Sequence, residues 1–239
     1  DEKANQFYKD RFFDYKDPLH KISIRIEGAV SYNALLFIPL EAPYGYYTKN
    51  YEKGLQLYSN DVLIMETCPE LLPDHFAFVR GVVDSADFSL NISREMLQHD
   101  RQLQLIAKNV EKRIRSELAK LQEEQRDLYE SFWKAFGLQI KYGMYADFGM
   151  HKDDLKDFVL FHSLQQQKLI TFKEYCSSMP TEQKEIYYAT GNNLTKIALL
   201  PQSERILDKG FDVLCMTDEV DEFAIKVLRE YEGKAFRSI

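Results

Sequence analysis

Cysteine is scarce in this chain, and the few cysteines present do not form a pattern. Cys68, Cys176 and Cys215 are odd in number and far apart, and no CxxC motif occurs. A disulfide framework uses an even number of cysteines, and a cysteine zinc site uses closely spaced pairs. The sequence therefore predicts neither. Free thiols without a framework are typical of a reducing compartment, so we expect a cytoplasmic protein.

The chain also lacks an excess of basic residues and a long apolar run. It has 31 Lys and Arg against 38 Asp and Glu, a formal net charge of -7. Nucleic acids and anionic membrane surfaces bind concentrated basic faces, so we expect neither as a general partner. A local basic site is still compatible with this charge. No stretch reaches the roughly 20 apolar residues that span a bilayer, which predicts no membrane partner.

A signal peptide and an initiator methionine are missing as well. The chain opens on the polar stretch DEKANQFYKD. A secretory signal would begin with a basic segment followed by an apolar one. We therefore expect a fragment of a longer protein, although a trimmed chain would begin in the same way.

Familiar catalytic motifs are absent. The chain contains no GxxxxGK[ST], GxGxxG, HExxH or GxSxG sequence. Its five histidines are scattered, with no pair three or four residues apart, and this predicts no metal site. No complete active site is visible, so an enzymatic role would need groups from outside the chain.

The residues that are present favour a mixed α/β fold. Ile22, Ile24 and Ile26 alternate with polar residues, which is typical of a half-buried strand. Residues 34–39 form an apolar run that ends at a proline, and residues 76–85 resemble another strand. Residues 55–65 hold two apolar runs around Ser-Asn-Asp, which predicts a hairpin.

The pattern then changes to a helical period. Seven apolar residues recur at steps of three and four and predict a helix from about Asp100 to about Gln125. They are Leu103, Ile106, Ala107, Val110, Ile114, Leu118 and Leu121. Residues 126–136 continue as helix, with Gly137 as the expected terminator. Residues 152–164 are also typical of a helix.

The last part alternates strand and helix. Residues 185–190 and 211–217 resemble strands, and helices are expected over 193–210 and 218–233, each ending at a glycine. This order predicts a small parallel α/β unit. We therefore expect a larger αβα-layered subdomain over 1–125, a helical connector over 126–165 and a smaller αβα subdomain over 166–239.

Two features suggest binding. The first is a loop over residues 42–54 that is bounded by proline and glycine and contains Tyr44, Tyr46, Tyr47 and Tyr51. Tyrosine combines apolar area with a polar tip, as many binding surfaces do. Aromatic rings also dominate ordinary cores. We expect about half of these rings to pack on the domain itself.

The second feature is Arg94, which lies where a polar, turn-rich segment meets the helical pattern. Gln98 follows four residues later, and in a helix the two share one face. An arginine fork beside an amide suits phosphate oxygens. The competing interpretation is a solvated arginine, or one paired with Glu95 or Asp100. The residues alone favour this competing interpretation.

The same region carries a family resemblance. The stretch FVRGVVDSADFSLNISREMLQ closely resembles the middle domain of the ninety-kilodalton heat-shock chaperone family. The resemblance covers essentially the whole chain in order. Its other motifs are DPLH, LLFIPLEAP, LQLYSNDVLIM, ELLPDHFAFVRGVVDS, YYATG and EYEGK.

The resemblance implies an ATP-dependent chaperone of three segments. The absent amino-terminal segment would bind ATP with Mg²⁺, and the absent carboxy-terminal segment would dimerise. Arg94 matches the arginine that reaches the γ-phosphate, and Gln98 matches a second residue of the same catalytic loop. This chain alone would bind no cofactor and would not hydrolyse ATP.

The resemblance also implies that unfolded or partly folded client proteins bind partly to this segment. Tyr15 matches a position where some relatives have an exposed tryptophan, although it could equally pack on its own domain. We expect Tyr15, Tyr44, Tyr46 and Tyr47 to contact clients. The alternative function is a non-catalytic module that recruits clients or partners through its aromatic surface.

Overall fold

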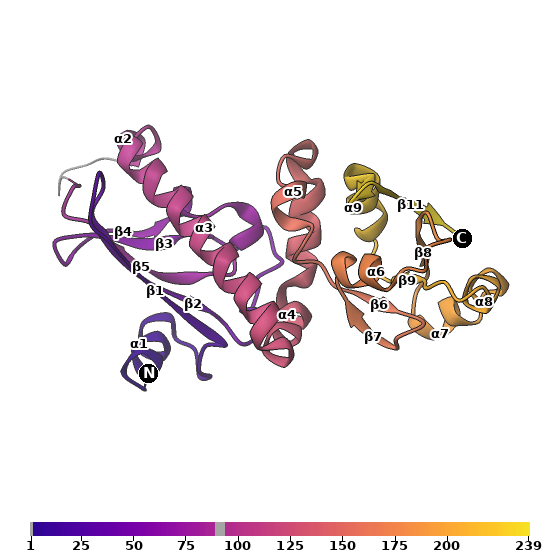
Figure 1. Cartoon of the computed structure of the whole chain (residues 1–239). Helices are drawn as coiled ribbons and strands as arrows, with labels where there is room; N and C mark the ends of the chain where they lie inside the picture. The colour runs from indigo at the N-terminus through magenta and orange to yellow at the C-terminus, as the bar shows by residue number, and fades with distance from the viewer. Residues whose placement is uncertain (1, 89–93) are drawn as a thin grey trace. The chain divides into compact units, whose positions relative to one another are not determined.

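The computed structural model describes residues 2–88 and 94–239 (Figure 1). Its internal contacts divide the chain into two compact units, Asp1–Phe136 and Gly137–Ile239. The predicted mixed α/β fold is confirmed, because each unit has its own sheet and its own helices. The division falls within one helix, and the predicted three-part boundaries stay a prediction.

The first unit is built on a five-stranded sheet of order β1-β2-β5-β3-β4. β3 and β5 are parallel, and the other neighbours are antiparallel. The strands are β1 (His20–Ile26), β2 (Tyr32–Ile38), β3 (Leu55–Ser59), β4 (Val62–Cys68) and β5 (Arg80–Asp84). The predicted hairpin is β3–β4, and Asn60 and Asp61 turn it in the left-handed region. Two short 3₁₀ turns, Pro69–Leu71 and Asp74–Phe76, precede β5.

Helices cover both faces of this sheet. The helices are α1 (Glu2–Phe12), α2 (Arg94–Gln98), α3 (Arg101–Glu124) and the first part of α4 (Arg126–Tyr145). His20 of β1 lies 3.0 Å from Glu117 of α3, so the even-numbered side of β1 faces α3. Phe37 of β2 lies on the opposite face, where its ring centroid is 5.1 Å from that of Tyr8 in α1. Figure 1 shows α1 and α3 on opposite sides of the sheet.

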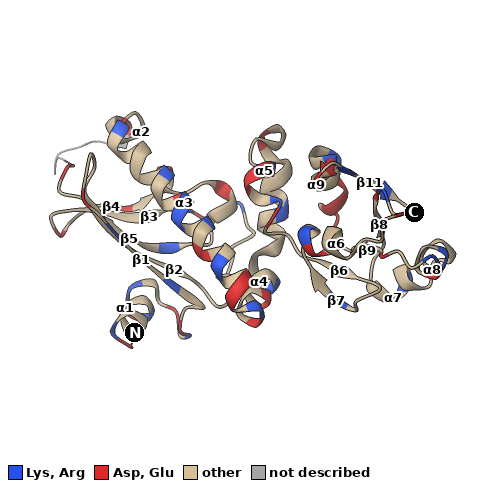
Figure 2. Ribbon diagram, in the orientation of Figure 1, with Lys and Arg blue, Asp and Glu red and all other residues tan. Residues whose placement is uncertain are grey.

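The long helix α3 confirms the period seen in the sequence. Its buried residues are Leu103, Ile106, Val110, Ile114, Leu118 and Leu121. Asp100 caps its first turn by accepting the N–H of Leu103 at 2.9 Å, which satisfies one of the free donors at a helix start. The outer face carries both signs of charge (Figure 2). Burial of one apolar stripe therefore holds α3 on the sheet.

The second unit has a six-stranded sheet of order β10-β11-β8-β9-β6-β7. β11, β8 and β9 are parallel to one another, and the remaining pairs are antiparallel. Its strands are β6 (Phe161–Ser163), β7 (Lys168–Ile170), β8 (Ile186–Thr190), β9 (Leu214–Met216), β10 (Glu230–Tyr231) and β11 (Lys234–Ser238). Its helices are α5 (Lys152–Leu155), α6 (Phe172–Ser178), α7 (Leu194–Ala198), α8 (Pro201–Asp208) and α9 (Asp221–Leu228), with a 3₁₀ turn at Ala146–Gly149.

Both faces of the second sheet are covered too. Phe172 of α6 packs on Phe161 of β6 and on Phe236 of β11, with ring centroids 5.3 and 5.0 Å apart. On the other face, Ile197 of α7 packs against Cys215 of β9. Successive residues of a strand point to opposite faces of the sheet, and in this register Phe161 and Cys215 point to opposite faces. The helices that pack on them, α6 and α7, therefore lie on opposite sides of the sheet.

Gly137 does not end a helix, contrary to the prediction. α4 continues through it to Tyr145. Phe132, Phe136, Ile140 and Met144 follow one another every four residues and are all buried. Burial of this stripe outweighs the roughly 1 kcal/mol by which glycine disfavours a helix interior.

The predicted helix over 152–164 was wrong in its second half. α5 ends at Leu155, and residues 161–163 form β6. The run from Phe158 to Phe161 is buried throughout. A short, fully buried apolar run does not distinguish strand from helix by its period, which explains the error.

The predicted helix over 193–210 is two helices. Asn193 caps α7 by accepting the N–H of Lys196, and Pro201 begins α8. Leu200 between them is extended, with φ -67° and ψ 130°. A residue before proline is pushed out of the helical region, so the chain turns here.

The last helix ends earlier than predicted. α9 stops at Leu228, and β10 and β11 then form a hairpin. Glu232 and Gly233 join these strands with positive φ angles of 49° and 74°. Two central residues with positive φ are the signature of a two-residue hairpin turn. The terminal glycine therefore marks a hairpin rather than a helix end.

Candidate functional site

Arg94 and Gln98 are the first and last residues of α2. Residues 89–93 and the side chains of Arg94 and Gln98 lie outside what the structure describes. Leu97 is fully buried and Met96 is 62 % exposed, so the burial of Leu97 sets which side of α2 faces the domain. Residues 94–98 are helical, which is the condition for Arg94 and Gln98 to share one face, although the predicted helix began only at about Asp100. A phosphate-facing Arg94–Gln98 pair, and the competing pairing with Glu95 or Asp100, stay predictions.

The chain on both sides of this segment is held by hydrogen bonds. The hydroxyl of Ser59 donates to the carbonyl of Phe88 at 2.7 Å, and the hydroxyl of Ser85 donates to the carbonyl of Ser31 at 2.7 Å. After α2, a carboxylate oxygen of Asp100 accepts a backbone N–H of α3. The chain is therefore held on the sheet up to Phe88, and Asp100 begins the long helix.

Tyr15 lies in a tight turn after α1. The buried hydroxyl of Tyr8 donates to Asp14 at 2.6 Å, and the N–H of Lys16 donates to the other oxygen of Asp14 at 3.1 Å. Phe13 has a φ of 54°, which redirects the chain. The pKa of the Tyr8 hydroxyl is raised far above its usual value, mainly by burial and to a smaller extent by the hydrogen bond to Asp14. The hydroxyl therefore keeps its proton and remains a donor. Tyr15 itself is 99 % exposed and does not pack on its own domain.

The tyrosine loop divides into packed and exposed rings. Tyr46 is buried, with ring centroids 4.7 Å from Tyr47, 4.8 Å from Tyr51 and 5.8 Å from Phe136. Burial raises the pKa of its hydroxyl. Tyr44 is fully exposed and Tyr47 is 54 % exposed, while Tyr51 is half-buried. Tyr46 therefore supports the loop from beneath and has little surface left for a partner.

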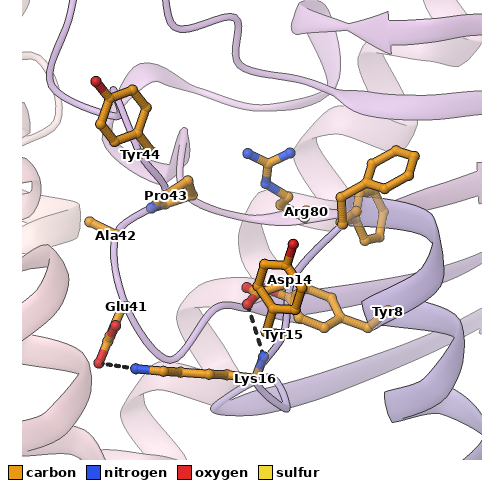
Figure 3. A pocket seen from close by; sticks show the side chains of 11 residues that line it. Tyr8, Asp14, Tyr15, Lys16, Glu41, Ala42, Pro43, Tyr44 and Arg80 are labelled. Carbon is orange, nitrogen blue, oxygen red and sulfur yellow. Dashed lines mark hydrogen bonds and ion pairs between the residues drawn. The ribbon is translucent and has the colours of Figure 1, made fainter.

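Two of the predicted contact residues meet at one hollow. Tyr15 and Tyr44 both line a cavity of about 420 Å³ between the end of α1 and the loop after β2 (Figure 3). Tyr46 and Tyr47 do not line it. The structure thus brings Tyr15 and Tyr44 to one place although 28 residues of sequence separate them.

Two other residues of this hollow were missed from the sequence. Phe13 is 89 % exposed, and Arg80 lines the hollow from the start of β5. Arg80 interrupts the apolar strand run FAFVRGVV, and a charge in such a run is a usable signal. Nothing in the sequence distinguishes the exposed Phe13 from its neighbour Phe12.

Comparisons with known proteins agree with this architecture. The family described as Hsp90 protein matches residues 1–239. The chain belongs to the Hsp90 family. It is 54 % identical over 239 residues to Chaperone protein HtpG of Oceanobacillus iheyensis and 55 % identical to Chaperone protein HtpG of Bacillus subtilis. Each alignment covers 100 % of this chain and 38 % of the relative, so the chain spans about two fifths of these proteins.

A solved structure places the chain within the Hsp90 architecture. The middle domain of a heat shock protein of Plasmodium falciparum matches with a TM-score of 0.82 and 29 % identity, over 99 % of this chain and 93 % of that one. The chain is therefore an Hsp90 middle domain. Within its described residues, no helix combines the length and the apolar character needed to cross a bilayer.

Proposed function

We propose that this chain is the middle segment of an ATP-dependent molecular chaperone and that Arg94 contacts the γ-phosphate of ATP. The nucleotide, with Mg²⁺, would be held by an amino-terminal ATPase domain outside this chain. The observation that carries the proposal is membership of the Hsp90 family over residues 1–239, together with the matching SRE and MLQ motifs, whose Arg94 and Gln98 begin and end α2.

The chemistry of phosphoryl transfer explains why an arginine is useful here. Negative charge on the γ-phosphoryl oxygens must be stabilised by preorganised donors as the bond to the β-phosphate breaks. Arg94 supplies a permanent charge and a planar fork of N–H donors. Gln98 lies one helical turn later and adds a neutral donor. Buried Leu97 supports both by fixing α2 on its domain.

The remaining parts of the proposed protein follow from the same family. A carboxy-terminal domain would dimerise the protein, and unfolded or partly folded clients would bind partly to this segment, in the cytoplasm. Tyr15 and Tyr44, with Tyr47, supply the exposed aromatic area for such clients. Tyr46 contributes by holding this loop in place.

ATP turnover tests the role of Arg94. In a full-length family protein that carries this segment, we expect Arg94→Ala to lower turnover about ten- to hundredfold, the range for one hydrogen bond to a charged group. Gln98→Ala should have a smaller effect. Arg101→Ala is the matched control, because Arg101 is an exposed arginine at the start of α3. Unchanged turnover in Arg94→Ala would remove the proposed role.

The exposure of Tyr15 and Tyr44 favours a second candidate, a binding module without a catalytic contribution. Under this alternative, Tyr15→Ala and Tyr44→Ala weaken client binding while Arg94→Ala leaves turnover unchanged. Leu105→Ala is the control for lost apolar surface, because Leu105 is 47 % exposed on α3. If both sets of variants act, the chain performs both roles.

A further inference from the structure

The hollow beneath Tyr15 and Tyr44 is one of two adjacent hollows. The second, of about 270 Å³, lies beside β3 and β4. The two hollows share three lining residues, Phe12, Phe13 and Arg80. Because these residues line both, the two hollows are adjacent at Arg80, and we refer to them together as the groove.

Arg80 is held in position but has no acidic partner. Its guanidinium carbon lies 5.8 Å from the ring centroid of Tyr51, within the range of a cation–π contact. Among the described residues, no carboxylate lies within ion-pair distance of it. Arg11, which lines only the second hollow, is held by neutral groups, because its guanidinium donates to Gln56 at 2.7 Å and to Tyr58 at 3.1 Å. Neither arginine of the groove has an acidic partner among the described residues, and Arg80 is the one that lines the hollow beside Tyr15 and Tyr44.

The acidic groups in the first hollow already have partners of their own. Asp14 accepts hydrogen bonds from Tyr8 and from the N–H of Lys16. Glu41 accepts from the ammonium group of Lys16 at 2.5 Å (Figure 3). The positive charge of Arg80 is thus available to an acidic group from outside the chain, while Tyr51 orients its guanidinium. The second hollow is lined by Glu52 and Glu66, which favours neutral or basic groups there.

We propose that this groove selects extended client segments in which an acidic residue is next to a large apolar residue. The carboxylate lies on the guanidinium of Arg80, and the apolar side chain packs on the exposed rings of Phe13, Tyr15 and Tyr44. An arginine fork matches a carboxylate in a bidentate geometry, and half-burial strengthens the bond by excluding water. This inference rests on the proposed client-binding role of Tyr15 and Tyr44, and it adds a specificity-determining residue.

A pair of labelled peptides tests the inference on the 239-residue chain. One short peptide has a central Glu-Phe pair, and the other has Gln-Phe at the same place. We expect the chain to bind the Glu-Phe peptide about tenfold more tightly, as measured by fluorescence anisotropy at low salt. Arg80→Gln should abolish this preference, and Arg80→Lys should keep part of it, because lysine retains the charge without the fork.

Two controls separate this inference from the broader proposal. Arg25→Gln removes a highly exposed arginine of the same unit and should leave the preference intact. Tyr15→Ala should weaken the binding of both peptides equally and leave the ratio of their affinities unchanged. Equal affinity of the unmodified chain for the two peptides would overturn the acidic preference while leaving aromatic client binding in place. No binding of either peptide would overturn the groove as a site, and the Arg94 role would stand on its own test.

Discussion

The hydroxyl of Tyr8 donates to a carboxylate oxygen of Asp14 at 2.6 Å, and this bond closes the turn that exposes Tyr15. Tyr8 is buried against Phe37 of the sheet, so the bond ties the turn to the core of the unit. The exposed ring of Tyr15 is therefore presented from a fixed base.

Tyr8→Phe tests this relationship. The variant removes the donor and leaves Asp14 with the N–H of Lys16. We expect a loss of about 1.5–3 kcal/mol in unfolding free energy, the range for a hydrogen bond to a charged group, and faster amide hydrogen exchange at residues 13–16. Tyr15→Phe is the control, because it removes a solvated hydroxyl. Unchanged exchange in Tyr8→Phe would show that the turn does not depend on this bond.

Lys141 provides a prediction for the second unit. Its ammonium nitrogen lies 2.7 Å from Asp221 and 2.8 Å from Asp218, and the Asp221 side chain is fully buried. Lys141→Met leaves the buried carboxylate of Asp221 without this cation. Breaking a buried pair in this way costs about 3–5 kcal/mol, measurable by denaturant unfolding. Lys226→Met removes an exposed lysine and should change stability by less than about 1 kcal/mol.

The pH dependence of that variant has a defined sign. Burial raises the pKa of Asp221, and Lys141 opposes the rise. Without Lys141 the folded chain holds a proton on Asp221 more tightly than the unfolded chain does. The variant should therefore be least destabilised at acidic pH and should lose stability as the pH rises through the carboxylate range. A loss of unfolding free energy in Lys141→Met that is the same at every pH would contradict this explanation.

Thiol reactivity reports the packing of both units. Burial raises the pKa of Cys68 and of Cys215 to about 12, and Cys176 is less buried. The thiolate is the reactive form, so we expect alkylation near pH 8 to modify Cys176 first and the other two only after unfolding. In the unfolded chain, the thiols of Cys68 and Cys215 lose their protons at a lower pH than in the folded chain. The free energy of unfolding should therefore fall as the pH rises above about 8.5. Rapid modification of Cys68 in the folded chain would contradict its burial.

The strongly periodic parts of the fold could be predicted from the sequence, and the locally ambiguous parts could not. The apolar residues from Leu103 to Leu121 predicted α3 because, in a long helix, the helical spacing of apolar residues repeats often enough to be recognised in the sequence. α1 was missed because it is polar and buries only Tyr8. α6 was missed although Thr171 and Glu174 form a capping box at its start.

The residues of the candidate site could be predicted only in part, because local sequence patterns do not specify tertiary contacts. The resemblance, not the local pattern, identified Arg94 and Gln98. Tyr46 and Tyr47 are identical neighbours in the sequence, and only packing against Phe136 makes one of them buried. Arg80 became a candidate once the structure placed Tyr15 and Tyr44 at the same hollow.

The most direct measurement of the central claim compares nucleotide affinities in a full-length family protein that carries this segment. A non-hydrolysable ATP analogue has a γ-phosphate for Arg94 to contact, and ADP does not. We predict that Arg94→Ala weakens binding of the analogue about tenfold or more and leaves ADP binding unchanged. Equal affinities of the variant and the unmodified protein for the analogue would contradict the contact between Arg94 and the γ-phosphate.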